Sequence, residues 1–239
     1  MAVFILLFIL DMVFAVLYVN YGFPKVTKLS FFYKMFASLI FVINGVLAYV
    51  MSTGSTYGKT VIAGLALGFA GDALLAIDPF LKGKALEHKT VFGVAGAAFF
   101  FLGHIMYIIS FIIEIKKENA FSLPLFLIAW IVMLAIGIAI KIKLKVALGK
   151  FAYPVLAYAL ALCAMCSLGI CLAVHNGGNR LLQLFLIIGP LCFVFSDATI
   201  VLRMFYKDKY ETIPMRYANL ITYFVSQMLI GTSIFMLYS

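Results

Sequence analysis

Residues 64–77 read GLALGFAGDALLAI, and this stretch decides how the chain must fold. It is a run of small and apolar residues with one carboxylate, Asp72, inside it. In a chain this apolar we predict that such a run crosses a membrane, where an aspartate at the helix centre costs roughly 2.5–3.5 kcal/mol on insertion scales. We therefore expect Asp72 to have a partner or a chemical task. A second carboxylate, Asp197, stands in a similar setting within FSDA at residues 195–198.

The composition indicates a polytopic membrane protein. Of the 239 residues, 66% are hydrophobic and 11% are charged, whereas soluble domains have about 45–50% apolar and about 25% charged residues. No polar stretch is long enough to form a separate domain, so we predict one transmembrane domain over residues 1–239. The net charge of +9 lies in short loops between apolar runs. This placement argues against a nucleic acid partner and for loops that set orientation and contact membrane lipid.

The hydropathy pattern predicts an all-α bundle of eight transmembrane helices. A span needs about 20 mostly apolar residues, and eight such runs are separated by short loops with turn signals. The predicted spans are 1–19, 31–51, 60–78, 92–114, 121–140, 152–174, 181–202 and 217–238. The N-terminus lacks the basic start and cleavage site of a signal peptide, so we expect the first run to stay as an anchor.

The lysines and arginines predict how the bundle is oriented. Odd-numbered loops hold thirteen of the 18 cations and even-numbered loops hold four, while Lys34 stands at the start of span two. By the positive-inside rule the odd loops are cytoplasmic and both termini are outside, in the cell membrane if the source is a bacterium. Asp72 and Asp197 then lie at a similar depth on helices that run in the same direction, which a parallel four-plus-four repeat would also produce.

Polar and small residues recur at helical spacing within the predicted spans. Gly64, Gly68 and Asp72 share one helix face, and a Gly-x-x-x-Gly seam lets another helix approach closely. His104 is the only histidine within a predicted span, and Tyr107 follows it by one turn. The last span carries a similar stripe at four-residue steps: Asn219, Tyr223, Gln227 and Gly231. Such stripes are expected to face the interior of the bundle.

Several of these residues also have a plainer explanation. A lone intramembrane histidine is often a hydrogen-bonded interface residue, and Tyr158 could simply pack near the interface. Lys34 could extend to the interface, pair with a carboxylate or bind a phosphate. Asp11 is a third carboxylate within a span. The four cysteines, including the pair at 163 and 166, are interpreted as small packing residues.

No motif of a serine hydrolase, a P-loop protein or a His-Glu-x-x-His zinc enzyme is present. A three-histidine zinc site is disfavoured because His88 and His175 fall in loops. We predict neither a metal nor another cofactor. A metal held by Asp72, Asp197 and His104 stays open as an alternative if these three side chains converge.

These motifs resemble those of the YhhN-type membrane proteins, a family that includes the lysoplasmalogenases. The resemblance runs over most of the chain, and its most specific parts are GDALL at 71–75, Gly96 with Phe100, His104 and Tyr107, FSD at 195–197, and Tyr223 with Gln227. Pro154, Tyr158 and Met165 fit the pattern of the sixth span. One departure is Lys34-Met35, where the family usually has Lys-Pro.

The resemblance implies hydrolysis of the vinyl ether bond of lysoplasmalogen, a lysophospholipid, to a fatty aldehyde and a glycerophospho-head group. Such a bond is cleaved by protonating its β-carbon and adding water to the oxocarbenium ion, which calls for one carboxylic acid and one carboxylate. Two carboxyls in a low-dielectric pocket can divide these roles. We predict Asp72, Asp197 and His104 as catalytic residues, with either aspartate as the acid. The predicted substrate-binding residues are Lys34, Tyr107, Tyr158, Ser196, Tyr223 and Gln227.

Two other functions fit the same residues. Intramembrane Asp, His and Tyr side chains also make proton relays, so a proton-coupled or small-molecule transporter is the first alternative. A lipid-binding protein without activity is the second. For the enzyme, the expected partners are a lysophospholipid that arrives sideways from the leaflet and the surrounding membrane lipid; no motif predicts an oligomeric state.

Overall fold

The computed structural model describes residues 1–23, 26–77 and 86–238, and these parts form a helical bundle. The long helices are α1 (Ala2–Gly22), α2 (Lys28–Val50), α3 (Thr56–Ile77), α4 (Leu86–Glu118), α5 (Leu123–Lys143), α6 (Ala152–His175), α7 (Arg180–Phe205) and α9 (Ile213–Tyr238). Two short helices are η2 (Gly149–Phe151) and α8 (Lys207–Tyr210). By length and composition, eight helices in the described parts can cross a membrane. The predicted all-α, eight-span bundle is confirmed.

The predicted span boundaries agree with the helices to within a few residues, except at the start of α4. This helix begins at Leu86, six residues before the predicted span. The added turns read LEHKTV and are mostly polar. Hydropathy finds only the apolar part of a helix, so it misses a polar extension beyond the membrane. The loop after the third predicted span has a turn signal at Asp78-Pro79 and contributes Lys82 and Lys84 to the cations of the odd loops. These four residues lie outside the described residues.

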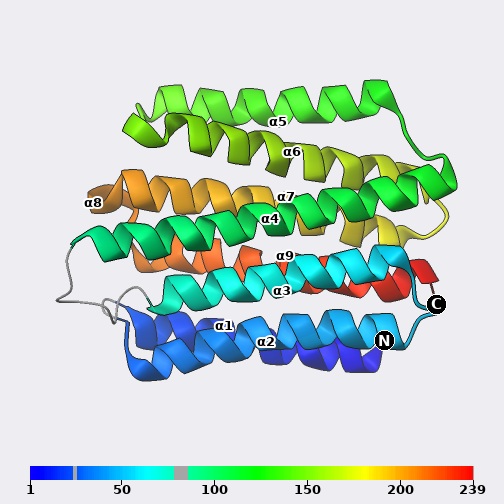
Figure 1. Cartoon of the computed structure of the whole chain (residues 1–239), viewed down its shortest axis with the longest axis horizontal. Helices are drawn as coiled ribbons and strands as arrows, with labels where there is room; N and C mark the ends of the chain where they lie inside the picture. The colour runs from blue at the N-terminus through cyan, green and yellow to red at the C-terminus, as the bar shows by residue number, and fades with distance from the viewer. Residues whose placement is uncertain (24–25, 78–85, 239) are drawn as a thin grey trace.

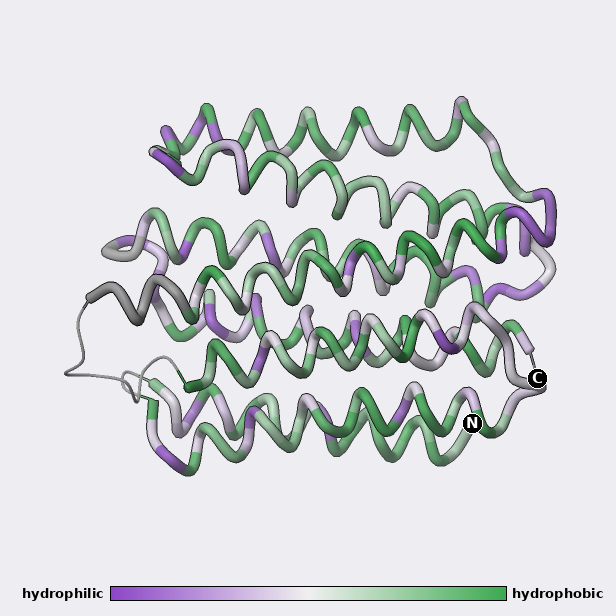
Figure 2. Tube along the Cα trace, in the orientation of Figure 1, coloured by the Kyte–Doolittle hydropathy of each residue, from purple (hydrophilic) through white to green (hydrophobic). Residues whose placement is uncertain are grey.

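The helices lie side by side along one common direction (Figure 1). The C-terminal ends of α1, α3, α5 and α7 gather at one end of the bundle, and both chain termini lie at the other end. The helices α3 and α7 therefore run in the same direction, as predicted. Apolar residues cover the bodies of the helices, while hydrophilic residues concentrate at the turns with a few inside the bundle (Figure 2).

The interior of the bundle is built around α9. This helix contacts α1, α2, α3 and α7 and has eleven buried residues. The opposite case is α5, which packs on α6 and has no buried residue. Its apolar side chains point outward, with Ile128 63% and Ile142 69% exposed. A helix that is apolar on all sides and unburied suits a lipid environment rather than water.

The glycine seam on α3 positions Asp72 between two neighbouring helices. A Cβ atom at Gly64 would lie 2.4 Å from the ring of Tyr107 on α4. A Cβ atom at Gly68 would lie 2.6 Å from Nε2 of Gln227 on α9. Only glycine leaves room for both contacts. The predicted seam is confirmed, and it brings α4 and α9 against the helix face that carries Asp72.

Candidate active site

Asp72 lies buried at the junction of α2, α3 and α9. Its Oδ1 is 3.0 Å from Nζ of Lys34. Its Oδ2 accepts hydrogen bonds from Oγ of Ser38 at 2.6 Å and from the hydroxyl of Tyr223 at 2.7 Å. Both carboxyl oxygens of Asp72 are therefore occupied by partners, and one of these partners carries a positive charge. Of the three roles considered for Lys34, the structure shows pairing with a carboxylate.

The Asp72 cluster continues along α9 towards α4. The hydroxyl of Tyr223 accepts a hydrogen bond from Nε2 of Gln227 at 3.2 Å. Oε1 of Gln227 in turn accepts one from the hydroxyl of Tyr107 at 2.6 Å. A chain of hydrogen bonds thus joins Asp72 to Tyr107 through the polar stripe of the last span, which faces the interior as predicted.

Asp197 belongs to a second cluster, formed by α4, α6 and α7. The hydroxyl of Tyr158 donates to Oδ2 of Asp197 at 2.7 Å. Nε2 of His104 lies 2.9 Å from the Tyr158 oxygen and 3.3 Å from the same Oδ2 atom. Because Tyr158 gives its only proton to Asp197, its oxygen is the acceptor for an N–H on Nε2 of His104. Tyr158, His104 and Asp197 thus form one hydrogen-bonded cluster.

The two clusters differ in their access to the surroundings. The side chain of Asp197 is 15% exposed, whereas that of Asp72 is 3% exposed. Nδ1 of His104 is buried and has no hydrogen-bond partner. Asp197 is thus the carboxylate that a molecule from outside can reach, and His104 has an unused polar atom beside it.

Aromatic rings lie where the two clusters meet, and the ring of Tyr107 is 6.5 Å from that of His104 between centroids. The ring of Phe193 lies 4.6 Å from that of His104 and 5.6 Å from that of Tyr223, measured between centroids. The Phe100 ring is 5.7 Å from Tyr223. No hydrogen bond or ion pair between described residues joins the two aspartates directly. The structure therefore brings the predicted residues together in two neighbouring groups, and Phe193 packs on both of them.

The family to which the chain belongs follows from its match to a family model. The model of the YhhN family matches residues 3–234 of the 239-residue chain. The chain belongs to the YhhN family. The resemblance found in the motifs is thereby confirmed over nearly the whole length. No curated protein and no solved structure gave a significant match.

In this YhhN-family protein, Ser196 is the predicted site residue that joins neither cluster. Its Oγ and its carbonyl oxygen each accept a hydrogen bond from Nδ2 of Asn219 at 2.9 Å. Thr199 adds a bond of 2.6 Å to the same carbonyl oxygen. Ser196 thus fastens α7 to α9 next to Asp197.

Asp11 also stands apart from both clusters. It is fully buried in α1, and neither of its carboxyl oxygens has a hydrogen-bond partner. Asp11 is therefore a buried carboxyl group without the partners that both Asp72 and Asp197 have.

The alternative of a metal held by both aspartates and His104 requires the three side chains to converge. Asp72 instead pairs with Lys34 and hydrogen-bonds with Ser38 and Tyr223. In the described parts of the chain, no three His, Cys, Asp or Glu side chains come together in a way that could hold a metal ion.

Two members of this YhhN-family site were missed in the sequence. Ser38 follows Lys34 by one helical turn, so helical spacing could have identified it as a neighbour of the ion pair. Phe193 carried no signal, because an apolar residue in an apolar span looks like any other packing residue.

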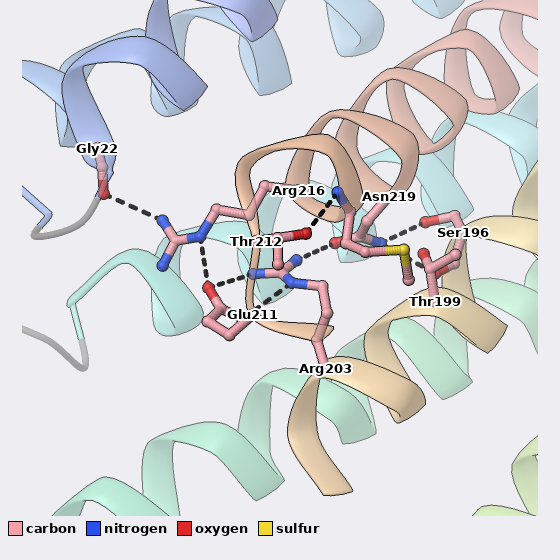
Figure 3. A network of polar contacts seen from close by, with 9 residues as sticks. Gly22, Ser196, Thr199, Arg203, Glu211, Thr212, Arg216 and Asn219 are labelled. Atoms are coloured by element: carbon pink, nitrogen blue, oxygen red, sulfur yellow. Dashed lines mark hydrogen bonds and ion pairs between the residues drawn. The ribbon is translucent and has the colours of Figure 1, made fainter. Parts of the chain in front are cut away.

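A charged cluster lies where α7 ends and α9 begins. In the sequence its two arginines, Arg203 and Arg216, were counted only as loop cations that set the orientation. Nε and Nη2 of Arg203 donate to Glu211 at 3.0 and 3.2 Å, and Nη1 donates to Asn219 at 2.7 Å (Figure 3). Arg216 donates to Glu211 and, at 3.0 Å, to the carbonyl oxygen of Gly22. Partial burial opposes ionisation of Glu211, but the hydrogen bonds and charges of the two arginines outweigh it and lower its pKa.

Proposed function

We propose that this YhhN-family protein is an integral membrane hydrolase that cleaves the vinyl ether bond of lysoplasmalogen. The products are a fatty aldehyde and a glycerophospho-head group. The observation that carries this proposal is the contrast between the surroundings of two carboxyl groups inside the bundle. Asp72 is paired with a cation and two hydroxyl donors, whereas Asp197 shares a hydrogen-bonded cluster with His104. Vinyl ether hydrolysis needs such a division between a carboxylate and a proton donor.

The reaction begins with transfer of a proton to the β-carbon of the vinyl ether. The electrons of the double bond form the new C–H bond, and the carbon attached to oxygen becomes an oxocarbenium ion. Water adds to that carbon and gives up a proton, which yields a hemiacetal. The hemiacetal then breaks into the aldehyde and the glycerol hydroxyl. One water molecule is consumed and the proton is returned.

We assign the proton donor to the cluster of His104, Tyr158 and Asp197. Asp72 is less suited to this role because its side chain is only 3% exposed and both of its oxygens already have partners. Its negative charge instead favours the oxocarbenium ion, since electrostatic effects are strong in a water-poor interior. The rings of His104 and Tyr223 both pack on Phe193, which makes the proposed proton donor and the Asp72 cluster neighbours.

The test measures aldehyde release from lysoplasmalogen by the purified protein in detergent, with products identified by mass. Loss of general acid–base catalysis typically lowers the rate by about 10²–10⁴-fold, and we expect this for Asp197→Asn. Tyr158→Phe removes one hydrogen bond to a charged group and should lower kcat by roughly 10–100-fold. Tyr57→Phe is the matched control, because it removes a buried hydroxyl bonded to Ser233 near the other end of the bundle.

Near-normal turnover by folded Asp197→Asn protein would overturn the assignment of the acid. Asp72→Asn is expected to lower kcat as well, because the cation loses its counter-charge. Full activity in this second variant would show that the Asp197 cluster acts alone.

A proton-coupled transporter is the second candidate, and one observation favours it. The hydrogen-bond chain from Asp72 through Tyr223 and Gln227 to Tyr107 joins three spans within the bundle. Polar chains of this kind conduct protons in membrane proteins. Proton or solute flux across sealed proteoliposomes, with no lipid product formed, would favour the transporter over the hydrolase.

A further inference from the structure

The charged cluster at the ends of α7 and α9 is not used by the catalytic groups. Arg203 lies in the last turn of α7, Glu211 precedes α9, and Arg216 lies in the first turn of α9. Their side chains are 15%, 20% and 16% exposed, so the cluster is partly open at the end of the bundle (Figure 3). Two guanidinium groups share this one carboxylate. The cluster of Arg203, Glu211 and Arg216 therefore carries an unbalanced positive charge.

The cluster lies one to two helical turns from the proposed proton donor. Arg203 follows Asp197 by six residues on α7, which is about 9 Å along a helix axis. The two are also joined through Asn219, which accepts from Arg203 and donates to Ser196, the neighbour of Asp197. In a lysophospholipid five bonds separate the ether oxygen from the phosphorus. A substrate with its ether at Asp197 and its head towards this end of the bundle would present its phosphate near Arg203.

Lys34 is poorly placed for the same task. Lys34 is only 5% exposed, and its Nζ lies 3.0 Å from Oδ1 of Asp72. A phosphate at Lys34 would have to displace that carboxylate from the interior of the bundle. Arginine, moreover, presents a planar fork of donors that matches two phosphate oxygens at once.

We propose that Arg203 and Arg216, rather than Lys34, form the subsite for the phosphate of a lysophospholipid head group. This proposal rests on the proposed function. Without substrate, Glu211 occupies the donors of both guanidinium groups. A bound phosphate takes over part of these hydrogen bonds, so Glu211 competes with the head group.

The rival explanation is a clamp that only holds helices together. Arg216 ties α9 to the end of α1 through the Gly22 carbonyl oxygen, and Arg203 ties α7 to α9 through Asn219. The two explanations differ in what they predict for Glu211. Removal of Glu211 lowers stability in either case. In a clamp it brings no gain in lipid binding, whereas in a phosphate subsite it frees guanidinium donors for the phosphate of the lipid.

The experiment compares two substrates with the same vinyl ether chain, lysoplasmalogen and the phosphate-free 1-alkenylglycerol. We expect Arg203→Gln and Arg216→Gln each to reduce the preference for lysoplasmalogen roughly tenfold, through a higher KM for that substrate. Glu211→Gln should increase this preference. Arg203→Lys should recover part of it, because one charge returns without the fork. Lys209→Gln is the control, since it removes an exposed neighbouring cation that lies outside the cluster.

Equal losses on both substrates in the arginine variants, or a loss of preference in Glu211→Gln, would overturn the subsite in favour of the clamp. Inorganic phosphate distinguishes a head group from a free anion. We expect inorganic phosphate to inhibit cleavage of lysoplasmalogen but not cleavage of 1-alkenylglycerol. Equal inhibition of both reactions would overturn the head-group assignment.

If the native protein releases no aldehyde from either lipid, the proposed function fails. The subsite is then tested separately by titrating lysophosphatidylethanolamine and monoacylglycerol into native and Arg203→Gln protein. Tighter binding of the phospholipid by the native protein, lost in the variant, supports the subsite. Equal binding of both lipids by native protein overturns it.

Discussion

Asp72 and Asp197 carry the same side chain in similarly apolar helices, but their neighbours give them different chemistry. Three polar groups surround Asp72, one of them a buried ammonium. Asp197 has a tyrosine hydroxyl and an imidazole, and part of its side chain is exposed. The insertion cost of an intramembrane aspartate is thus offset by partners in both cases. Only Asp197 combines partners that can exchange a proton with access from outside.

The ion pair at Asp72 makes a prediction for stability. Lys34→Met leaves the Asp72 carboxylate buried without its cation, and breaking a buried pair in this way costs about 3–5 kcal/mol. We expect a clear drop in the thermal unfolding temperature of this variant in detergent. The double variant Lys34→Met with Asp72→Asn should regain most of the loss, because neither charge is then left alone.

Lys28→Met is the control for Lys34→Met, because Lys28 is exposed at the start of α2. The Lys28→Met protein should unfold at the same temperature as the native protein. A double variant that is less stable than Lys34→Met alone would contradict the ion pair as the source of the effect.

At the scale of elements, α3 is the helix that brings the polar groups together. Its glycine face admits the Tyr107 ring of α4 and the Gln227 side chain of α9, and Asp72 stands on the same face one turn further on. The hydrogen bond between Tyr107 and Gln227 closes this contact from the other side. The seam is therefore both a packing device and the geometric cause of the Asp72 cluster.

A larger side chain in the seam is expected to disturb both packing and site. In Gly64→Val the new atoms collide with the Tyr107 ring, and overpacking of this kind costs typically about 1–3 kcal/mol. We expect a lower unfolding temperature and a weaker Asp72 cluster. Gly137→Ala on α5 is the matched control, because no heavy atom lies within 4 Å of the added Cβ. Equal effects of the two substitutions on thermal unfolding would refute the seam.

At the scale of the whole molecule, the cluster of Arg203, Glu211 and Arg216 joins the ends of three helices. The pKa of Glu211 lies below its ordinary value of 4.5 in the folded protein. The folded state therefore binds fewer protons than the unfolded state near that pH. The stability that Glu211 contributes is present above pH 4.5 and is lost as the pH falls through the lower folded pKa.

This linkage predicts the behaviour of Glu211→Gln. Its unfolding temperature should lie below that of the native protein at neutral pH, and the difference should shrink as the pH is lowered below 4.5. Thermal unfolding of both proteins in detergent, in buffers that cover this pH range, measures the difference in unfolding temperature. A difference that does not change with pH would mean that the charge of Glu211 is not the stabilising feature.

The orientation of the bundle also belongs to this scale. Both termini lie at the end opposite to the C-terminal ends of α1, α3, α5 and α7 (Figure 1). With the odd loops in the cytoplasm, Thr53→Cys should react with an impermeant maleimide added outside sealed right-side-out vesicles. Lys150→Cys should react only after the vesicles are opened. Labelling of the native protein gives the background from its own four cysteines, three of which are buried. The reverse labelling pattern, with Lys150→Cys labelled from outside and Thr53→Cys protected, would mean that the predicted orientation is wrong.

The sequence by itself determined the number of membrane-spanning helices, their alternating course through the bundle and the presence of costly polar groups inside them. These are local properties, because a bilayer demands about 20 apolar residues per span and makes every intramembrane charge conspicuous. Helical spacing also showed which polar residues share a face. The exact helix ends could not be predicted where polar turns extend a helix beyond its apolar part, as at Leu86.

Only the tertiary structure decided which polar groups meet. Tyr223 and Asp72 lie 151 residues apart in the chain, and His104 and Asp197 lie 93 apart. Lys34 had three plausible roles until packing placed it against Asp72. Phe193 and the arginine cluster gave no site signal, because an apolar ring and loop cations are ordinary in a membrane protein. Partner choice depends on the packing of several helices at once, and no local pattern encodes it.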